Sequence, residues 1–275
     1  MNHRAAKPFQ VHTHCQCMQA GPRRQHFSQS KETKLSLAEA PGKGTLTALV
    51  NWTHPCAAVI PCFNEAPLIA ALTADVGRHL PHIIVVDDGS TDGTARQAQA
   101  AGAEVIRLGR NSGKGAALQA GWRHARQQGF TWVLTMDGDG QHSPDDIPKF
   151  LARAEHKAAA LVVGDRMGNS AAMPWLRRQV NRWMTRRLSA LAGVHLTDSQ
   201  CGFRLAHLET LLRLPLSARR FEIESETLVA FLTAGLRVEF VPIRVIYESG
   251  RSHIRPFMDT WRWLRWWAAQ QPVSV

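Results

Sequence analysis

Short apolar runs alternate with longer stretches of helical periodicity from Cys56 onward. The runs are brief and rich in β-branched residues, which predicts strands, whereas apolar residues three and four positions apart predict helices between them. The expected strands are 57–60, 83–86, 104–108, 131–136 and 160–163, and the expected helices are 65–79, a segment after Thr91, 115–128 and one opened by Ser143 and Pro144. This alternation predicts an α/β fold in which helices flank a mostly parallel central sheet.

Polar motifs that contain glycine or proline follow several of the expected strands. They occupy residues 61–65, 87–90, 111–115 and 137–141. In open parallel sheets, ligands bind beyond the carboxyl ends of the strands. We therefore expect these four motifs to form one binding site at a single edge of the sheet.

The sequence Asp-Gly-Asp-Gly-Gln at 137–141 places two acids and an amide at alternate positions of a loop. Carboxylate and amide oxygens suit Mg²⁺ or Mn²⁺, and glycine lets the backbone approach a phosphate. Asp137, Asp139 and Gln141 are therefore candidate ligands for a divalent metal and a nucleotide diphosphate. A plain Asp/Gly turn that binds nothing is the alternative for this motif taken alone.

Two further motifs carry charge at expected strand or helix ends. Asp87 and Asp88 close an apolar strand together, where their charges repel unless a ligand or a hydrogen-bond donor separates them. Lys114 lies between two glycines at an expected helix start, from which it can reach a diphosphate; a solvated loop lysine is the alternative. A Walker phosphate loop is excluded, because Gly115 stands where Ser or Thr is required.

The composition of the chain indicates an anionic partner and a poorly ordered N-terminal segment. The 275 residues suffice for one large α/β domain, and the formal net charge of +11 indicates nucleic acid, a lipid surface or a phosphorylated substrate. Residues 1–50 are basic, polar and aperiodic, which predicts a poorly ordered tail. The five cysteines form no disulfide pattern, which fits a reducing cytoplasm. The chain has no run of eighteen apolar residues and no secretory signal, so we expect neither a membrane span nor export.

The four motifs, in their order along the chain, resemble those of the inverting family-two glycosyltransferases. They read Val-Ile-Pro-Cys-Phe-Asn-Glu at 59–65, Val-Val-Asp-Asp-Gly-Ser-Thr-Asp-Gly-Thr at 85–94, Asn-Ser-Gly-Lys-Gly at 111–115 and Met-Asp-Gly-Asp-Gly-Gln-His at 136–142. Two later motifs, 198–204 and 241–243, most resemble the dolichol-phosphate mannose synthase branch. The resemblance covers about 59–255 and implies a GT-A type fold that binds a nucleotide sugar.

Carried over position by position, the resemblance implies roles for single residues. Pro61, Asn64 and Glu65 would shape the base and ribose pocket, Asp88 would contact the base, Lys114 would lie near the diphosphate, Asp137, Asp139 and Gln141 would hold the Mg²⁺ or Mn²⁺ and the nucleotide, and Arg166 would bind phosphate. Three positions depart from the common family pattern: Asp165 replaces a serine, and Cys62 and Phe63 replace a small residue and a tyrosine. The base, uracil or guanine, and the sugar therefore stay open.

The second half of the chain is rich in arginine and tryptophan. Residues 173–192 predict an amphipathic helix whose apolar stripe is Leu176, Val180, Trp183, Met184, Leu188 and Leu191 and whose other positions carry Arg177, Arg178, Arg182, Arg186 and Arg187. Together with Arg166, Arg204 and Arg251, these arginines predict a positively charged site for a lipid phosphate or for anionic headgroups. Within this site, Arg177 and Arg251 are the candidates for binding the acceptor. The alternative is a core-facing helix with a solvated basic face. Near the C-terminus Trp261, Trp263, Trp266 and Trp267 alternate with Arg262 and Arg265, which favours an interfacial helix or packing on the catalytic domain.

The acceptor decides which residues would be catalytic. A polyprenyl phosphate is already an anionic nucleophile and needs arginines, Arg166 and Arg204, to align it. A hydroxyl acceptor also needs a carboxylate to take its proton, first Asp198 and then Glu224 or Glu226. Asp198 bracing the turn at Gly202 is the structural alternative.

The leading hypothesis is a metal-dependent glycosyltransferase that moves a hexose from a GDP- or UDP-sugar to a lipid acceptor, with a polyprenyl phosphate favoured over a lipid or aromatic hydroxyl. We expect it to be peripheral on the anionic cytoplasmic face of a membrane, with 1–50 as tail, 51–255 as the glycosyltransferase domain and 256–275 as an amphipathic segment. The alternatives are a basic nucleic-acid- or membrane-binding module and a catalytically idle scaffold. A nucleic-acid partner is disfavoured, because the acidic loops would repel phosphates without a metal. The oligomeric state is left open.

Overall fold

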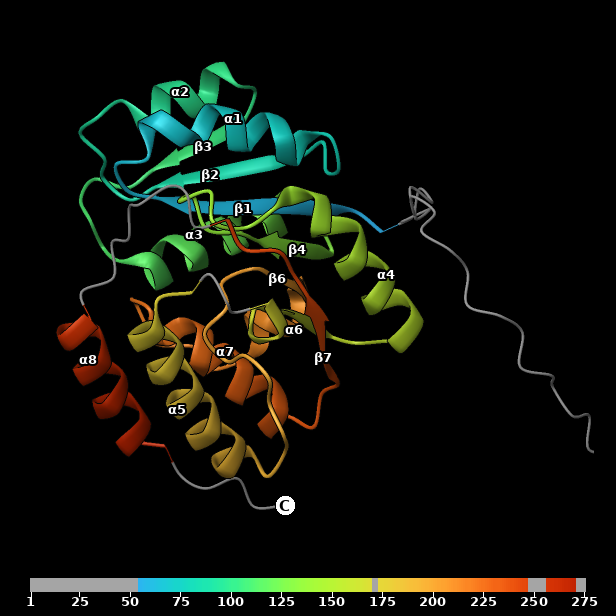
Figure 1. The fold of residues 1–275 in the computed structure, drawn as a ribbon. Helices are drawn as coiled ribbons and strands as arrows, with labels where there is room; N and C mark the ends of the chain where they lie inside the picture. The colour runs from blue at the N-terminus through green and yellow to red at the C-terminus, as the bar shows by residue number, and fades with distance from the viewer. Residues whose placement is uncertain (1–53, 170–172, 247–255, 271–275) are drawn as a thin grey trace, which may run out of the picture. The chain divides into compact units, whose positions relative to one another are not determined.

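A computed structural model describes residues 54–169, 173–246 and 256–270, whose strands form one seven-stranded sheet. The strands are β1 (Cys56–Cys62), β2 (Ile83–Asp87), β3 (Glu104–Arg107), β4 (Trp132–Thr135), β5 (Leu161–Asp165), β6 (Arg204–His207) and β7 (Val238–Pro242). Their order in the sheet is β3-β2-β1-β4-β6-β5-β7 (Figure 1). All pairs are parallel except those of β6, which runs antiparallel to β4 and β5. The predicted α/β fold with a mostly parallel sheet is confirmed.

Helices connect and flank these strands. They are α1 (Ala66–Gly77), α2 (Thr94–Ala100), α3 (Lys114–Gln127), α4 (Ile147–Lys157), α5 (Trp175–Ala192), α6 (Leu208–Arg213), α7 (Glu222–Thr233) and α8 (Pro256–Ala268), with the short 3-10 helices η1 (Pro144–Asp146) and η2 (Met167–Asn169). Helix α3 contacts β1 and β2, α4 contacts β5 and β7, and α7 contacts both α5 and α8. Each parallel strand therefore delivers the chain to the same edge of the sheet before the next helix begins.

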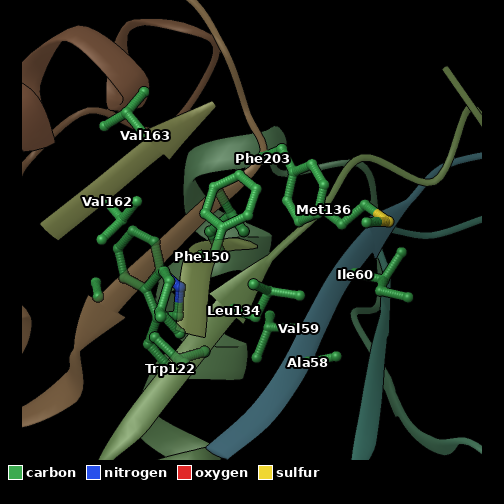
Figure 2. Close-up of a cluster of buried hydrophobic side chains, with 14 of the residues drawn as sticks. Ala58, Val59, Ile60, Trp122, Leu134, Met136, Phe150, Val162, Val163 and Phe203 are labelled. Carbon is green, nitrogen blue, oxygen red and sulfur yellow. The ribbon is translucent and has the colours of Figure 1, made fainter. Parts of the chain in front are cut away.

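Buried hydrophobic side chains from strands and helices form the core (Figure 2). Val59 and Leu134, from β1 and β4, are fully buried, and the rings of Phe150 and Phe203 stack with centroids 4.2 Å apart. Helix α3 lies unusually close to the sheet, since a Cβ on Gly121 would come within 2.5 Å of a Val59 methyl group. Burial of this apolar surface is the main favourable term in folding, and it holds the polar loops beyond the strands on a rigid base.

The expected elements from 56 to 165 are confirmed within a few residues at their ends, whereas four later elements were not predicted. These are β6, α6, α7 and β7. Strand β6 reads Arg-Leu-Ala-His, so it lacks the apolar run that announces the other central strands. Its arginine is nevertheless buried, because the strand lies between two neighbours in the middle of the sheet.

The predicted apolar stripe of α5 is wrong at two of its positions, Leu176 and Trp183. Leu176 is 60% exposed and Trp183 is 36% exposed, whereas the polar side chains of Asn181 and Thr185 are buried. The reason is hydrogen bonding: Asn181 Nδ2 lies 3.1 Å from Asp198, and Thr185 Oγ1 lies 2.9 Å from Ser199 Oγ. These bonds turn a partly polar face of α5 toward the domain and leave apolar side chains outside.

Three predictions fall on residues outside the described part of the chain. They concern the basic tail 1–50, Arg251 and the end of the segment 256–275. Among the described helices, none combines the length and the apolar character that crossing a bilayer requires.

Candidate active site

The loops that follow β1 and β2 are tied to each other. Asn64, which has a left-handed backbone (φ 57°), donates its N–H to Ser90 Oγ at 2.9 Å and accepts the Thr91 N–H on Oδ1 at 3.0 Å. The N–H of buried Glu65 donates to Thr94 Oγ1 at 2.9 Å. Residues 61–65 and 87–94 therefore form one unit, as expected for motifs at the same sheet edge. Base and ribose binding by Pro61, Asn64 and Glu65 stays a prediction.

Backbone donors separate the two adjacent carboxylates at the end of β2. Asp87 Oδ1 accepts the Ser90 N–H at 2.9 Å, whereas the two oxygens of Asp88 accept the N–H groups of Ser112 at 2.7 Å and Gly113 at 2.8 Å. Burial raises the pKa of Asp88, an effect that these donors and Arg220 only partly offset. Asp88 thus holds the 111–113 loop in place, and its predicted contact with the base would be made by a carboxylate that already has two donors.

A loop before α7 packs against the start of α3. A Cβ on Gly113 would lie 2.5 Å from the Arg219 carbonyl oxygen, and one on Gly115 would lie 2.5 Å from that of Ala218, so only glycine permits this approach. The Ala116 N–H donates to the Arg219 oxygen at 3.1 Å. The exposed side chains of Arg219 and Arg220 are thereby held beside the Gly-Lys-Gly motif.

Lys114, the first residue of α3, reaches two carboxylates. Its Nζ lies 2.5 Å from Asp137 Oδ1 and forms a second, very short ion pair with Glu224 Oε1. Burial lowers the pKa of Lys114, but Asp137 and Glu224 outweigh it and raise the pKa above its ordinary value. Lys114 is therefore a charged ammonium group at the same place as the Asp-Gly-Asp-Gly-Gln loop, and the two motifs that were expected to converge do so.

Two carboxylates and an amide follow β4 on one loop. Asp139 Oδ1 accepts the Gln141 N–H at 3.1 Å, and Gln141 Oε1 accepts a hydrogen bond from Arg177 at 3.2 Å. Burial and the neighbouring charge of Asp137 raise the pKa of Asp139. Burial alone would raise the pKa of Asp137, but Lys114 and His142 outweigh burial and hold this pKa below its ordinary range. A cation between these two acids would relieve their repulsion.

The donor set fits a divalent ion that is bound together with phosphate oxygens. Within the described ranges, no group of three His, Cys, Asp or Glu side chains could hold a metal by itself. Mg²⁺ is commonly held by one or two carboxylates plus water and substrate phosphates rather than by a full protein cage. Asp137, Asp139 and Gln141 are such a partial set. Gly202 keeps space beside it, since a Cβ there would lie 2.6 Å from both Asp137 carboxylate oxygens.

Asp198 forms a buried ion pair with Arg166. Its carboxylate accepts Nε of Arg166 at 2.7 Å and a terminal guanidinium nitrogen at 2.9 Å, and it also accepts Asn181 Nδ2 and the Gln200 N–H, each at 3.1 Å. Asp198 is fully buried; burial raises its pKa, but Arg166 and the hydrogen bonds outweigh this and lower it. A general base needs an accessible lone pair and a pKa near the working pH. The geometry of Asp198 therefore supports the structural alternative, in which its carboxylate stabilises the protein, rather than the general base.

Arg204 is likewise committed to the protein interior. It donates to three backbone carbonyls, those of Cys201 at 2.7 Å, Ser199 at 3.0 Å and Glu224 at 2.5 Å, and it is 5% exposed. Burial lowers its pKa. Direct binding of an acceptor phosphate, as predicted for Arg204, would require breaking these bonds.

The remaining carboxylates considered as bases differ in their surroundings. Glu226 accepts the N–H groups of Ser217 and Ala218 and the Ser217 hydroxyl, so it fixes the loop before α7. Glu224 instead faces Lys114.

The model of glycosyl transferase family 2 matches residues 57–213, more than half of the chain. The chain belongs to glycosyl transferase family 2. It is 31% identical to the UDP-N-acetylglucosamine–dolichyl-phosphate N-acetylglucosaminyltransferase of Methanococcus voltae, over 70% of this chain and 85% of that protein. It is also 31% identical to the undecaprenyl-phosphate mannosyltransferase of Micrococcus luteus, again over 70% and 85% of the two chains.

A solved structure agrees with the fold of this glycosyltransferase. Glucosyl-3-phosphoglycerate synthase from Mycobacterium tuberculosis, crystallised with Mn²⁺, UDP and glucosyl-3-phosphoglycerate, superposes with a TM-score of 0.62 at 22% identity and covers 83% of each chain. The fold is thus of the GT-A type, which confirms the expectation drawn from the motifs.

Sequence reasoning on this glycosyltransferase missed the loop that carries Arg219 and Arg220. Two adjacent arginines just before an acid-rich helix were the only signal, and nothing in the sequence ties them to Gly113, about a hundred residues earlier. The structure makes that connection through backbone contacts rather than through a motif.

Proposed function

We propose that this glycosyltransferase transfers a hexose, with inversion, from a UDP- or GDP-sugar to a polyprenyl phosphate, using Mg²⁺ or Mn²⁺. The observation that carries the donor side is the convergence of Lys114 with Asp137 at the carboxyl edge of the sheet, on the loop that also presents Asp139 and Gln141. The names of the two relatives support a polyprenyl-phosphate acceptor. The neighbour crystallised with Mn²⁺ and UDP supports a metal and a nucleotide.

On this proposal each loop has its own task on the donor side. Asp137, Asp139 and Gln141 would hold the metal, which would neutralise charge on the departing diphosphate. Asp88 positions the 111–113 loop, and with it the start of α3 where Lys114 can approach the same diphosphate. The tied loops 61–65 and 87–94 would accept the base and the ribose.

The acceptor side favours a phosphate over a hydroxyl. Of the three carboxylates considered as general bases, Asp198 and Glu226 accept several donors each, and Glu224 is paired with Lys114. A phosphate acceptor needs no base, because it is already an anionic nucleophile. Arg177, whose guanidinium contacts Gln141, links the arginine-rich α5 to the metal loop and is the first candidate to receive the phosphate.

We infer that α5 and α8 rest on an anionic membrane. Both helices expose large apolar side chains: Trp175 is 65%, Leu176 60% and Trp261 60% exposed. Exposed arginines such as Arg182 share α5 with them, a composition that suits the headgroup region of a bilayer.

Helix α8 packs on the domain with one face and exposes another, which supports packing on the catalytic domain and leaves a face for the proposed membrane contact. Trp263 is 2% exposed, donates Nε1–H to Ser225 Oγ at 2.8 Å, and meets the Trp183 ring of α5 edge-on with the ring centroids 5.5 Å apart. Residues 51–255 would then be the catalytic domain, with 256–275 as its membrane-contacting segment.

Purified enzyme tests the proposal directly. UDP- and GDP-hexoses are offered with undecaprenyl phosphate or with a hydroxylated lipid in vesicles, with Mn²⁺ or with chelator. We expect the product, a hexosyl undecaprenyl phosphate, to form only in the presence of the metal, and we expect no transfer to the hydroxylated lipid. Transfer to hydroxyl acceptors alone would contradict the acceptor class, and full activity in chelator would contradict the metal.

A further inference from the structure

The Lys114 ammonium group lies between two carboxylates that come from different parts of the fold. Asp137 follows β4, Glu224 lies in the first turn of α7, and Lys114 opens α3. Glu224 is 5% exposed, so its carboxylate is buried with Lys114 as its cation. A buried carboxylate without a partner is strongly destabilising. The ion pair with Lys114 therefore stabilises the buried Glu224 carboxylate, and the sequence alone did not indicate this pair.

The backbone on both sides of Lys114 is held by contacts with other segments. Gly113 on one side donates to Asp88, and Gly115 on the other is pressed against the Ala218 carbonyl. The Lys114 side chain is long and flexible, and both carboxylates lie within its reach. Its positive charge can thus pass from being shared by two acids to being held by Glu224 alone.

A divalent ion placed on Asp137 meets this ammonium group. Two positive charges a few ångströms apart repel each other, and the repulsion is stronger at a partly buried site than in bulk water. A nucleotide diphosphate brings negative charge that offsets both the metal and Lys114. The bare ion lacks that compensation.

We propose that Lys114 is a tethered counter-ion for Asp137 and that Glu224 positions it, so that the enzyme binds the divalent ion together with the nucleotide and the bare ion only weakly. This rests on the proposed function, because it takes Asp137 as a metal ligand. Glu224 is on this view a positioning residue, which retains the ammonium group when the metal–nucleotide complex reaches Asp137.

Binding of Mn²⁺ alone, followed by electron paramagnetic resonance, tests this without any turnover. In Lys114→Met we expect bare Mn²⁺ to bind about tenfold more tightly or better, because the repelling unit charge is gone. The same variant should bind UDP or GDP with Mn²⁺ more weakly, by calorimetry, because the diphosphate loses a cation. A purely structural lysine would not move the two affinities in opposite directions.

Glu224→Gln supplies an independent arm if Lys114→Met does not fold. In this variant the Lys114 ammonium group keeps Asp137 but loses the Glu224 carboxylate. Lys114 should then stay closer to Asp137, so Mn²⁺ without nucleotide should bind more weakly than it does to the wild type. Lys114→Arg keeps the charge and should keep bare binding weak. Lys149→Met removes a lysine that pairs with Asp146 at 2.6 Å elsewhere on the surface, and it should change neither affinity.

Two results would overturn the inference. The first is that folded Lys114→Met binds Mn²⁺ without nucleotide as weakly as the wild type does. The second is that Glu224→Gln binds Mn²⁺ without nucleotide as tightly as the wild type or more tightly. Either result leaves the proposed function standing if the wild type still binds Mn²⁺ with UDP or GDP. Loss of metal binding in the wild type under all conditions, nucleotide included, would overturn the inference and the metal-dependent function together.

Discussion

The donor loops and the acceptor-side motif use their charged residues in opposite ways. At the ends of β2 and β4, backbone N–H groups and a lysine surround the acids, and Asp137 keeps 26% of its side chain exposed. In the 198–204 motif, Asp198 and Arg204 are buried and satisfied from within the protein. A motif can therefore mark a frame as well as a binding surface. Geometry is needed to tell which.

The largest expected effect breaks the frame. Asp198→Ala removes the carboxylate that pairs with buried Arg166, and removal of one partner of a buried ion pair costs about 3–5 kcal/mol. We expect the free energy of unfolding in urea to fall by that amount. Asp139→Ala, on the donor loop, is the matched control and should change stability much less. Equal losses in the two variants would remove the distinction between frame and surface.

The same ion pair predicts a dependence on pH. The pKa of Asp198 is lowered in the folded protein, so its contribution to stability is present above the pKa of the unfolded chain, about 3.9, and is lost as the pH falls toward the folded value. Unfolding free energies measured from neutral to acidic pH should therefore decline less steeply at the acid end in Asp198→Asn than in the wild type. Parallel curves would contradict the assignment.

The next effect lies on the surface side of the comparison. Asp139→Asn removes one of the two carboxylates proposed for the metal, so we expect UDP or GDP to bind about 100-fold more weakly and without a response to Mn²⁺, as for other weakened metal sites. Calorimetry with and without Mn²⁺ measures this. Undiminished, metal-responsive binding would show that Asp139 is not a ligand.

A smaller effect is expected on the membrane face. Replacing Trp175 and Trp261 by Ala should weaken flotation with anionic vesicles about tenfold, and salt should weaken the wild type further, since charge acts over about 10 Å at 0.1 M salt. Val194→Ala, also an exposed apolar side chain, is the control. Vesicle binding that ignores both changes would place the contact elsewhere.

The smallest effect concerns the loop before α7, which packs against the start of α3. Arg220→Ala should weaken nucleotide binding only a few-fold, because exposed charges contribute little, and should leave the Mn²⁺ response intact. Arg213→Ala on α6, which pairs with Glu209, is the matched control in calorimetry. A loss as large as that of Asp139→Asn would make Arg220 part of the central site.

The contrast also sets how far the sequence could predict this molecule. Strands 57–60 and 83–86 were recognisable because burial on both faces requires continuous apolar runs. The pairing of Arg166 with Asp198, 32 residues apart, has no periodic signal, and neither has the pairing of Lys114 with Glu224. Helix α5 was misjudged because two buried hydrogen bonds, rather than hydrophobicity, set its rotation. Local pattern predicts elements, whereas contacts between distant polar residues decide what each acid does.

The reversed direction of β6 has a practical consequence for attaching probes. Because this strand begins at the edge where its neighbours end, the 198–203 segment enters the site, and the chain leaves β6 at the opposite edge. The turns at Gly102, Gly129 and Gly235, which lead into β3, β4 and β7, lie at that opposite edge. Each of these glycines has a positive φ that other residues rarely adopt, so the neighbouring turn residues are the places for attachment. Fluorophores, surface-immobilisation tags or inserted peptides placed there would report on the enzyme from the side away from the reaction.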